Sequence, residues 1–313
     1  MKNIKLNYDS YSIDAIASAE ISKFYSQKEV IFEKYPRKRD SLRELKHIFL
    51  SRFSSLTFSH RENDAKEQYE GIWSAKTVSD VFRTGGQRDS GIAASTQILF
   101  EGRLLSSEMW SLNATIVSTF ASYLRQEGKD KNNILEVGSG NGFNLIALAA
   151  QFPSKKFVGL ELTESGVSAS NKAVADSRTV MNLCEFVFGA NNKYSGGPLQ
   201  NIKFIQEDVT RLNPNLVATD QIFSVLAQEQ MDQVYDGFLS AIKKMKDTDF
   251  FFFEPYLDFN SYYQALILKT KKYLYRDSME LEKVLGIEVE KYKMPMKINK
   301  KKYAFGILKG KTN

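Results

Sequence analysis

The run at residues 134–145 constrains the fold of this chain more than any other stretch. It reads Ile-Leu-Glu-Val-Gly-Ser-Gly-Asn-Gly-Phe-Asn-Leu, so residues suited to a buried parallel strand lead directly into three glycines at alternate positions. Apolar residues then recur from Leu145 to Ala150 as they do in a helix. Glycine lets the backbone turn sharply and lets a ligand approach it closely, because no side chain intervenes. The run therefore predicts a strand, a tight turn and a helix start that hold a nucleotide-like ligand.

The spacing of the glycines separates two kinds of nucleotide site. Dinucleotide-binding folds use G-x-G-x-x-G, in which the third glycine lets the helix pack on the strand. Here the third glycine comes one residue early, at Gly142, and Phe143 stands where that fold has Gly or Ala. The pattern E-x-G-x-G-x-G, from Glu136 to Gly142, resembles instead motif I of the class I S-adenosylmethionine (SAM) dependent methyltransferases. This resemblance implies an α/β, Rossmann-like sheet of seven mostly parallel strands that ends in a C-terminal antiparallel hairpin.

Further landmarks of that family follow in order. Apolar runs suited to buried strands lie at residues 156–161, 201–206, 221–225 and 250–253. Glu161 ends the first of them, at the distance where such folds place a ribose-binding acid. A carboxylate suits that role because it only accepts hydrogen bonds, and the ribose diol offers two donors. Asp208 follows the second run and is similar to the acid with which the family binds the adenine amino group.

The resemblance implies SAM as the cofactor and a set of residues that hold it. These lie in the glycine-rich turn and at the ends of the following strands: Glu136, Gly138, Ser139, Gly140, Asn141, Gly142, Glu161, Leu162, Asp208, Val209 and Ser224. Taken alone, Glu161 and Asp208 could each be a solvated acid at a strand end. Glu136 is harder to explain in that way, because an acid inside an apolar strand needs a donor partner if it is buried.

Length and composition indicate a two-part enzyme without a metal. With 313 residues the chain exceeds one typical domain. We expect a mainly helical region at 1–106 that covers the substrate, followed by a SAM-binding methyltransferase domain at 107–313. One cysteine and two histidines make a structural zinc site implausible, and Cys184 is expected to fill apolar space. No apolar run is long enough for a membrane span and the start lacks a signal peptide, so a cytoplasmic location is expected.

Periodicity predicts the elements around the landmarks. Helices are expected at residues 14–28 and 41–53, and a long helix carries an apolar stripe from Met109 to Leu124 before a stop at Gly128. That helix should pack against the sheet. In the second domain we expect a loop at 190–197, helices at 229–245 and 262–275, and two strands at 288–292 and 302–308 that form the closing hairpin.

The catalytic residues are the least constrained part of the sequence. Methyl transfer depends on placement of the acceptor, which is worth about 7 to 11 kcal/mol, while a general base adds typically 10²–10⁴-fold and is optional. Many relatives that methylate small molecules carry a histidine after strand four, where this chain has Glu229-Gln230. Three residues remain as candidates: Glu254, Glu229 and His60. Glu254 is preferred because ligands bind beyond the carboxyl ends of parallel strands.

Each candidate also has a simpler interpretation. Glu229 suits the first turn of a helix electrostatically, without any catalytic role. His60 lies in a polar stretch that fits a lid, whereas His47 lies on a predicted amphipathic helix and is interpreted as structural. The triplet from Glu254 to Tyr256 resembles the D-P-P-Y motif of base-modifying methyltransferases only superficially, because that motif follows strand four and this one follows strand five.

Aromatic and cationic residues suggest how the acceptor is bound. The substrate-binding candidates suit a planar, sugar-like or anionic group: Tyr69, Trp73, Arg83, Arg88 and Tyr256. Dispersed surface positions are the alternative for each of them. The favoured function is therefore methyl transfer to a small molecule, most simply to a hydroxyl of a metabolite, saccharide or natural product.

The charge pattern keeps other partners open. Net charge is +6, and eight lysines but no acid follow Glu290. Such a stripe suits RNA or DNA, and it equally suits a strand edge protected by lysines. A nucleic-acid methyltransferase is therefore the main alternative, with protein methylation and a non-catalytic SAM-binding partner subunit behind it. The forward region could serve as a lid, as a homodimer surface or as both.

Overall fold

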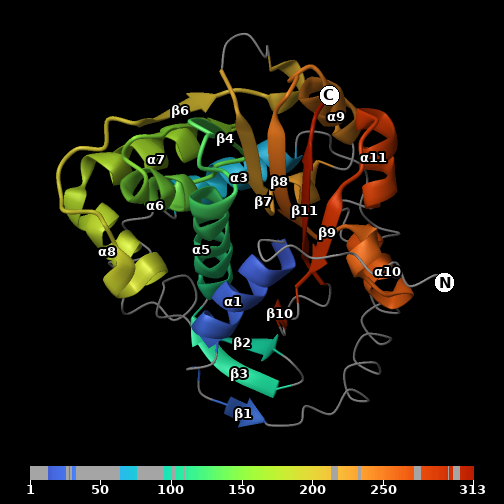
Figure 1. Ribbon diagram of the computed structural model, residues 1–313, viewed down its shortest axis with the longest axis horizontal. Helices are drawn as coiled ribbons and strands as arrows, with labels where there is room; N and C mark the ends of the chain where they lie inside the picture. Colours follow the sequence, from blue (N-terminus) through green and yellow to red (C-terminus); the bar gives the residue numbers. More distant parts are fainter. Residues whose placement is uncertain are drawn as a thin grey trace.

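A seven-stranded sheet forms the centre of the molecule (Figure 1). The computed structural model describes residues 13–25, 28, 30–32, 64–75, 95–100, 103–108, 110–212, 218–231, 234–270, 276–294, 296–298 and 304–313. The strand order is β6-β5-β4-β7-β8-β11-β9. The strands are β4 (Asn133–Val137), β5 (Lys156–Glu161), β6 (Ile202–Gln206), β7 (Gln221–Val225), β8 (Asp249–Glu254), β9 (Glu290–Lys293) and β11 (Gly306–Lys311).

Strand directions confirm the predicted sheet. The strands β6, β5, β4, β7 and β8 pair in parallel, while β11 is antiparallel to both β8 and β9. The central strands are buried on both faces, as parallel strands covered by helices must be. The closing hairpin is thus confirmed in its pairing, but β11 begins only at Gly306, later than predicted.

Successive side chains of the strands point to opposite faces of the sheet, and each face forms its own hydrophobic core with the helices that cover it. On one face, Ile134, Phe223 and Phe251 pack with helices α5 (Ser111–Gln126), α6 (Phe143–Gln151) and α8 (Ser177–Phe188). On the other face, Leu135 and Phe252 pack with α9 (Tyr235–Lys243) and α11 (Ser278–Leu285). Helix α7 (Glu164–Ala175) packs near the β6 edge, and α10 (Tyr262–Thr270) follows β8 (Figure 1).

Helix α5 confirms the long amphipathic helix predicted before the first strand of the sheet. Its residue Phe120 is fully buried and stacks on Phe223, with ring centroids 4.2 Å apart; it also packs at a tilt against Phe251, with ring centroids 5.0 Å apart. Helix α1 (Ile13–Tyr25) confirms the first predicted helix and lies against α5. Glu20 fixes that contact by accepting hydrogen bonds from the hydroxyls of Ser118 (2.5 Å) and Ser122 (2.8 Å).

Two further predictions concern helices. The predicted helix at 229–245 is divided, because a 3-10 turn, η4 (Gln228–Gln230), precedes α9. A helix not predicted as such, α3 (Asp64–Ala75), lies before the sheet in sequence. The helix predicted at 41–53 lies outside the described residues.

A second, smaller sheet was not predicted. It is antiparallel, has the order β1-β3-β2-β10, and consists of β1 (Val30–Phe32), β3 (Arg103–Glu108), β2 (Ser95–Phe100) and β10 (Met296–Ile298). The forward region therefore contains strands as well as helices. The boundary proposed at residue 106 falls inside β3, and β10 comes from between β9 and β11, so this small sheet joins both proposed parts of the chain.

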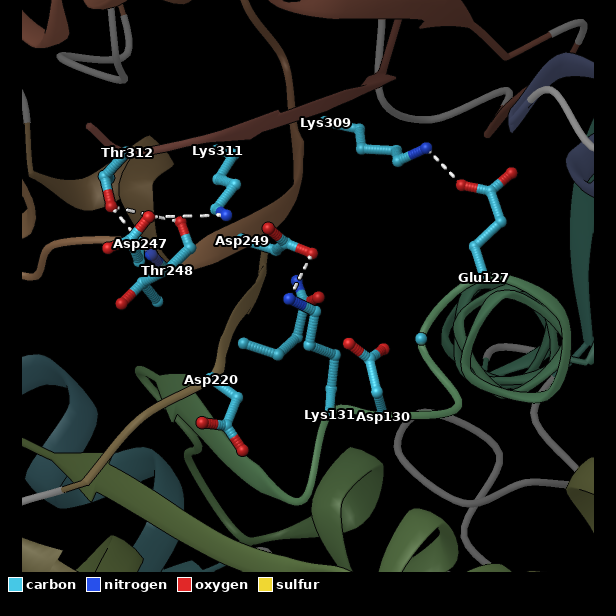
Figure 2. Close-up of polar contacts among 12 residues, drawn as sticks. Glu127, Asp130, Lys131, Asp220, Asp247, Thr248, Asp249, Lys309, Lys311 and Thr312 are labelled. Atoms are coloured by element: carbon cyan, nitrogen blue, oxygen red, sulfur yellow. Dashed lines mark hydrogen bonds and ion pairs between the residues drawn. The ribbon is translucent and has the colours of Figure 1, made fainter.

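The amino edge of the large sheet is held by paired charges (Figure 2). The Asp220 carboxylate accepts from the amides of Asn132 and Asn133, each at 2.9 Å, and Lys131 lies 3.0 Å from the Asp249 carboxylate. Lys309 pairs with Glu127. The Asp220 contacts satisfy backbone amides just before and at the start of β4, and the two ion pairs link side chains there. Among the helices of the described ranges, none combines the length and the apolar composition that crossing a membrane needs.

We expect the aromatic stack between α5 and the sheet to dominate stability. Replacing Phe120→Ala leaves a cavity between α5, β7 and β8, and should lower the free energy of unfolding by about 3–5 kcal/mol in urea titrations. Met181→Ala on the half-exposed side of α8 is the control and should change it by less than about 0.5 kcal/mol. Equal losses in the two variants would contradict this assignment of the core.

Candidate active site

The glycine-rich turn has the backbone shape that the sequence predicts. Gly138, Gly140 and Gly142 all have left-handed φ values, of 70°, 55° and 81°. The amides of Gly138 and Ser139 both donate to the carbonyl of Leu160, at 2.9 Å each, so the turn is fastened to the end of β5. Helix α6 begins directly after Gly142. The strand, turn and helix start are therefore confirmed.

Two of these glycines also admit close neighbours. A Cβ atom at Gly138 would lie 2.3 Å from the Cβ of Ala227, in the segment after β7. A Cβ atom at Gly140 would lie 2.7 Å from the Trp73 ring of α3. Both the conformation and the space thus require glycine, and the turn is in contact with two segments that lie far from it in the sequence.

Glu161 joins this turn to the start of α7. Its buried carboxylate accepts hydrogen bonds from the amide of Gly140 (2.9 Å), the amide of Thr163 (3.0 Å) and the Thr163 hydroxyl (2.6 Å). The next side chain, Leu162, is 42% exposed. An acceptor group and an apolar surface therefore lie together at the carboxyl end of β5.

Glu136 is fully buried below the turn. One of its oxygens accepts a 2.7 Å hydrogen bond from the Asn144 amide, and the other has no partner among the described residues. Burial raises the pKa of this carboxyl to about 8; the Asn144 hydrogen bond opposes the shift and the nearby Glu161 adds to it. A donor, or a positive charge, beside the second oxygen would lower the cost of burying this group.

Unpartnered polar atoms gather at one edge of the sheet. Within the described ranges, the buried side-chain nitrogens and oxygens that lack a hydrogen-bond partner are Glu136 Oε2, Ser139 Oγ, Asn144 Oδ1, Ser165 Oγ and Gln228 Nε2. All belong to β4, to the glycine-rich turn and helix start, or to the segments that follow β5 and β7. Since buried polar groups are normally paired, this edge has the unmet hydrogen-bonding capacity of a ligand site.

The other predicted cofactor residues lie at the same edge. Asp208 follows β6 and is partly exposed; it accepts from the Thr210 amide (2.9 Å) and hydroxyl (2.8 Å), and so begins the 3-10 turn η2 (Val209–Arg211). Val209 is buried. Ser224 is in β7 and donates its hydroxyl to Glu254 at 2.7 Å.

Glu254 lies deeper than its expected role as a general base requires. It is fully buried, and besides Ser224 its carboxylate accepts from the amides of Ala227 (3.0 Å), Gln228 (3.1 Å) and Glu229 (3.1 Å). Burial acts to raise the pKa of Glu254; the hydrogen bonds from Ser224 and from the backbone amides oppose this shift, and the neighbouring Glu229 carboxylate adds to it. Such a group is already saturated by protein donors, which favours a structural role over proton transfer.

Two further candidates share this enclosed environment. Glu229 is also buried and belongs to the 3-10 turn η4, not to the first turn of an α-helix. Tyr256 is fully buried and donates its hydroxyl to Gln228 at 2.5 Å, with the Tyr235 hydroxyl at 3.4 Å. Burial raises the pKa of Tyr256 far above its ordinary value. The structure thus places Tyr256 behind the site, where we had expected a substrate-binding residue.

Helix α3 lies over the glycine-rich turn. Trp73 contacts Gly140, Tyr69 lies 6.0 Å from Trp73 between ring centroids, and the Glu70 carboxylate accepts from the amide of Ser165 at 2.8 Å. Two of the substrate-binding candidates are therefore beside the predicted cofactor site. His60, Arg83 and Arg88 lie outside the described residues.

Sequence reasoning missed several residues of this edge. Glu70 carries no local signal, because its role arises from a contact across the fold with the amide of Ser165. Thr163 has one: it precedes a helix, and its side chain accepts from the amide of Gly166, as helix N-caps do. In the described part of the chain, no three His, Cys, Asp or Glu residues are grouped so that they could hold a metal ion.

Comparisons with known proteins concern this same part of the chain. Residues 130–235 match the model of a family described as a putative methyltransferase. No relative of the chain was found among curated proteins.

Similar solved structures cover more of the chain at low identity. Magnesium protoporphyrin IX methyltransferase from Synechocystis PCC 6803, with bound SAM, is 12% identical over 82% of this chain and 100% of that chain, with a TM-score of 0.48. Mitomycin 7-O-methyltransferase is 12% identical over 98% of this chain and 74% of that chain, with the same TM-score of 0.48. These values leave the acceptor of this chain undefined.

The family match contains four strands of the large sheet, the glycine-rich turn and both strand-end acids, Glu161 and Asp208. The sheet has the mixed topology that the resemblance implies, with its antiparallel closing strand. Over residues 130–235 the chain is accordingly similar to a methyltransferase family, and its sheet has the fold that the resemblance implies.

Proposed function

We propose that the protein transfers a methyl group from SAM to a small molecule, most simply to a hydroxyl group. The observation that carries the proposal is the set of unpartnered buried polar atoms at the carboxyl edge of the sheet, next to a glycine-rich turn that excludes side chains. The amino edge, by contrast, carries carboxylates with hydrogen-bond and ion-pair partners. Among the described residues, the buried polar atoms without a partner lie at the carboxyl edge.

The residues of this edge fit the chemical groups of SAM. Glu161 would accept from the ribose hydroxyls, Asp208 from the adenine amino group, and Leu162 would offer its exposed side chain to the adenine ring. Glu136, whose second oxygen lacks a partner, fits an ammonium group. When bound, SAM supplies an activated methyl group: the acceptor oxygen bonds to its carbon, the carbon–sulfur bond breaks, and the acceptor proton passes to water.

Placement, more than base catalysis, is the contribution we assign to the protein. Glu254 and Glu229 are both buried, and the oxygens of Glu254 are already occupied by four donors. Because both carboxylates are buried, neither is arranged to take a proton from a methyl acceptor that enters the site from solvent. Positioning can supply about 7–11 kcal/mol of the barrier by itself, so the reaction does not require a base.

Two observations support a small acceptor over a nucleic acid. Helix α3 lies on the glycine-rich turn, and a covered site suits a small ligand. Three lysines of the basic C-terminal stripe are paired with acids: Lys291 with Glu282 (3.3 Å), Lys309 with Glu290 (3.2 Å) and Lys311 with Asp247 (3.4 Å). Their charge is partly neutralised within the protein, which weakens an electrostatic footprint for phosphates.

Removing the strand-end acids tests the cofactor site. Glu161→Ala and Asp208→Ala should each weaken SAM binding by about 1.5–3 kcal/mol in calorimetry, the usual contribution of a hydrogen bond to a charged group. Glu164→Ala, which removes an exposed acid from the first turn of α7, is the matched control and should bind SAM normally. Folded Glu161 and Asp208 variants with unchanged affinity would refute this placement of the cofactor.

Trp73 offers a second test that needs no acceptor. The chain has two tryptophans, Trp73 and Trp110, so a Trp110→Phe variant reports on Trp73 alone. Because the Trp73 ring lies against Gly140, S-adenosylhomocysteine should change its fluorescence with the same dissociation constant that calorimetry gives. A variant that also carries Trp73→Phe supplies the background. Binding seen by calorimetry without any fluorescence change would show that α3 does not lie at the cofactor.

Salt dependence separates the two classes of acceptor. A nucleic-acid substrate neutralised by the lysines would release counterions, so its affinity would fall steeply with salt. We expect only weak, sequence-indifferent RNA binding that is lost near physiological salt, and no selective loss when Lys300, Lys301 and Lys302 are changed to glutamine. Tight, structure-selective RNA binding at that salt would favour the nucleic-acid alternative instead.

A further inference from the structure

The end of β8 and the segment after β7 are fastened together by one buried carboxylate. Glu254 Oε1 accepts from the Ser224 hydroxyl (2.7 Å) and from the amides of Ala227 (3.0 Å) and Gln228 (3.1 Å), while Oε2 accepts from the amide of Glu229 (3.1 Å). Three consecutive backbone amides therefore converge on one side chain. The carboxylate supplies the hydrogen-bond acceptors that these amides, at the start of a 3-10 turn, would otherwise lack.

The fastened segment borders the glycine-rich turn. Ala227 is the residue whose Cβ leaves no room for a side chain at Gly138. Just before it, Leu226 has a left-handed φ of 55°, which a leucine rarely adopts, and its amide donates to the carbonyl of Phe253 at 3.0 Å. A conformation of this kind costs about 1–3 kcal/mol and persists only where the surroundings impose it. Here the β8 backbone and Glu254 impose it.

A second buried layer supports the same segment. Gln228 is fully buried; its side-chain oxygen accepts from Tyr256, which follows β8, and its side-chain nitrogen has no partner in the structure. The Tyr235 hydroxyl lies 3.4 Å from that of Tyr256. The shape of the segment after β7 is thus decided by residues of β8, of α9 and of the turn after β8.

We propose that Glu254 is a positioning residue, which holds the segment 226–229 against the glycine-rich turn in the shape that binds the cofactor and faces the acceptor. This inference rests on the proposed function, since it assigns the segment to the methyl-transfer site. Glu254 acts through the backbone of Ala227, Gln228 and Glu229, and not by contact with the reacting atoms.

The side-chain chemistry makes a carboxylate necessary. A glutamine at position 254 has one accepting oxygen and one donating NH₂ group. In the geometry of Glu254 its oxygen could serve Ser224, Ala227 and Gln228, but its NH₂ would then face the amide of Glu229, another donor. Glu254→Gln therefore keeps the size of the side chain and removes the acceptor at one defined amide.

The test combines backbone exchange with ligand affinity in the full chain. In Glu254→Gln, amide hydrogen exchange at residues 227–229 should become at least tenfold faster, and S-adenosylhomocysteine should bind roughly tenfold more weakly. In the wild-type protein that ligand should slow exchange in the same segment, and in the variant this protection should be lost. Ser224→Ala, which removes one donor and keeps the carboxylate, should shift both quantities in the same direction by less.

Asp220→Asn is the matched control. Asp220 also caps backbone amides with a carboxylate, but at the opposite, amino edge of the sheet. The Asp220→Asn variant should have a lower melting temperature, with unchanged ligand affinity and unchanged amide exchange at residues 227–229. If Glu254 had a merely structural role, Glu254→Gln would behave in the same way.

Three outcomes overturn the inference in distinguishable ways. Unchanged exchange at 227–229 in folded Glu254→Gln would show that the carboxylate does not hold the segment, whatever the protein binds. Faster exchange with normal ligand affinity would limit Glu254 to stability. A wild-type protein that binds neither SAM nor S-adenosylhomocysteine would refute the proposed function itself, and with it any role of Glu254 in methyl transfer. If Glu254→Gln does not fold, Ser224→Ala decides by the same two measurements.

Discussion

The close approach of backbone segments at the glycine-rich turn is the constraint on which the rest of the site depends. The amides of Gly138 and Ser139 fasten the turn to the carbonyl of Leu160, and Gly138 and Gly140 leave room for Ala227 on one side and Trp73 on the other. A side chain at Gly138 or Gly140 would push these neighbours away. The turn therefore sets where the segment after β7 and helix α3 lie, and through them the shape of the carboxyl edge of the sheet.

Three buried carboxylates at that edge differ in how many hydrogen bonds they accept from the protein. Glu161 and Glu254 each accept several protein donors, so their burial is compensated by hydrogen bonds. Glu136 has one partner for two oxygens, and burial raises its pKa to about 8. Glu254, with four donors, holds a loop in place. Glu161 has three donors and so retains one acceptor position, while Glu136 retains a whole oxygen. All three carboxylates are buried, so burial does not distinguish their roles; the number of protein donors that each one accepts from does.

The two ends of the parallel strands differ in the same way. At the amino edge, Lys131, Asp220 and Asp249 find partners within the protein (Figure 2). At the carboxyl edge, side chains such as Glu136 and Gln228 keep unpaired atoms. The amino ends thus contribute to stability, and the carboxyl ends are where we propose ligand binding, as the connections of parallel strands allow.

Local sequence determined the strands, the glycine-rich turn, its adjoining helix and the position of Glu161, because hydrophobic period and glycine spacing report on near neighbours. It did not determine the small second sheet, since β2 pairs with β10 from almost 200 residues later in the chain. Nor did it place Glu254, which a strand-end position suggested for contact with the acceptor. Only the tertiary structure brings three amides of another loop onto that carboxylate, and hydrogen-bond partners 25 to 27 residues apart leave no periodic trace in a sequence.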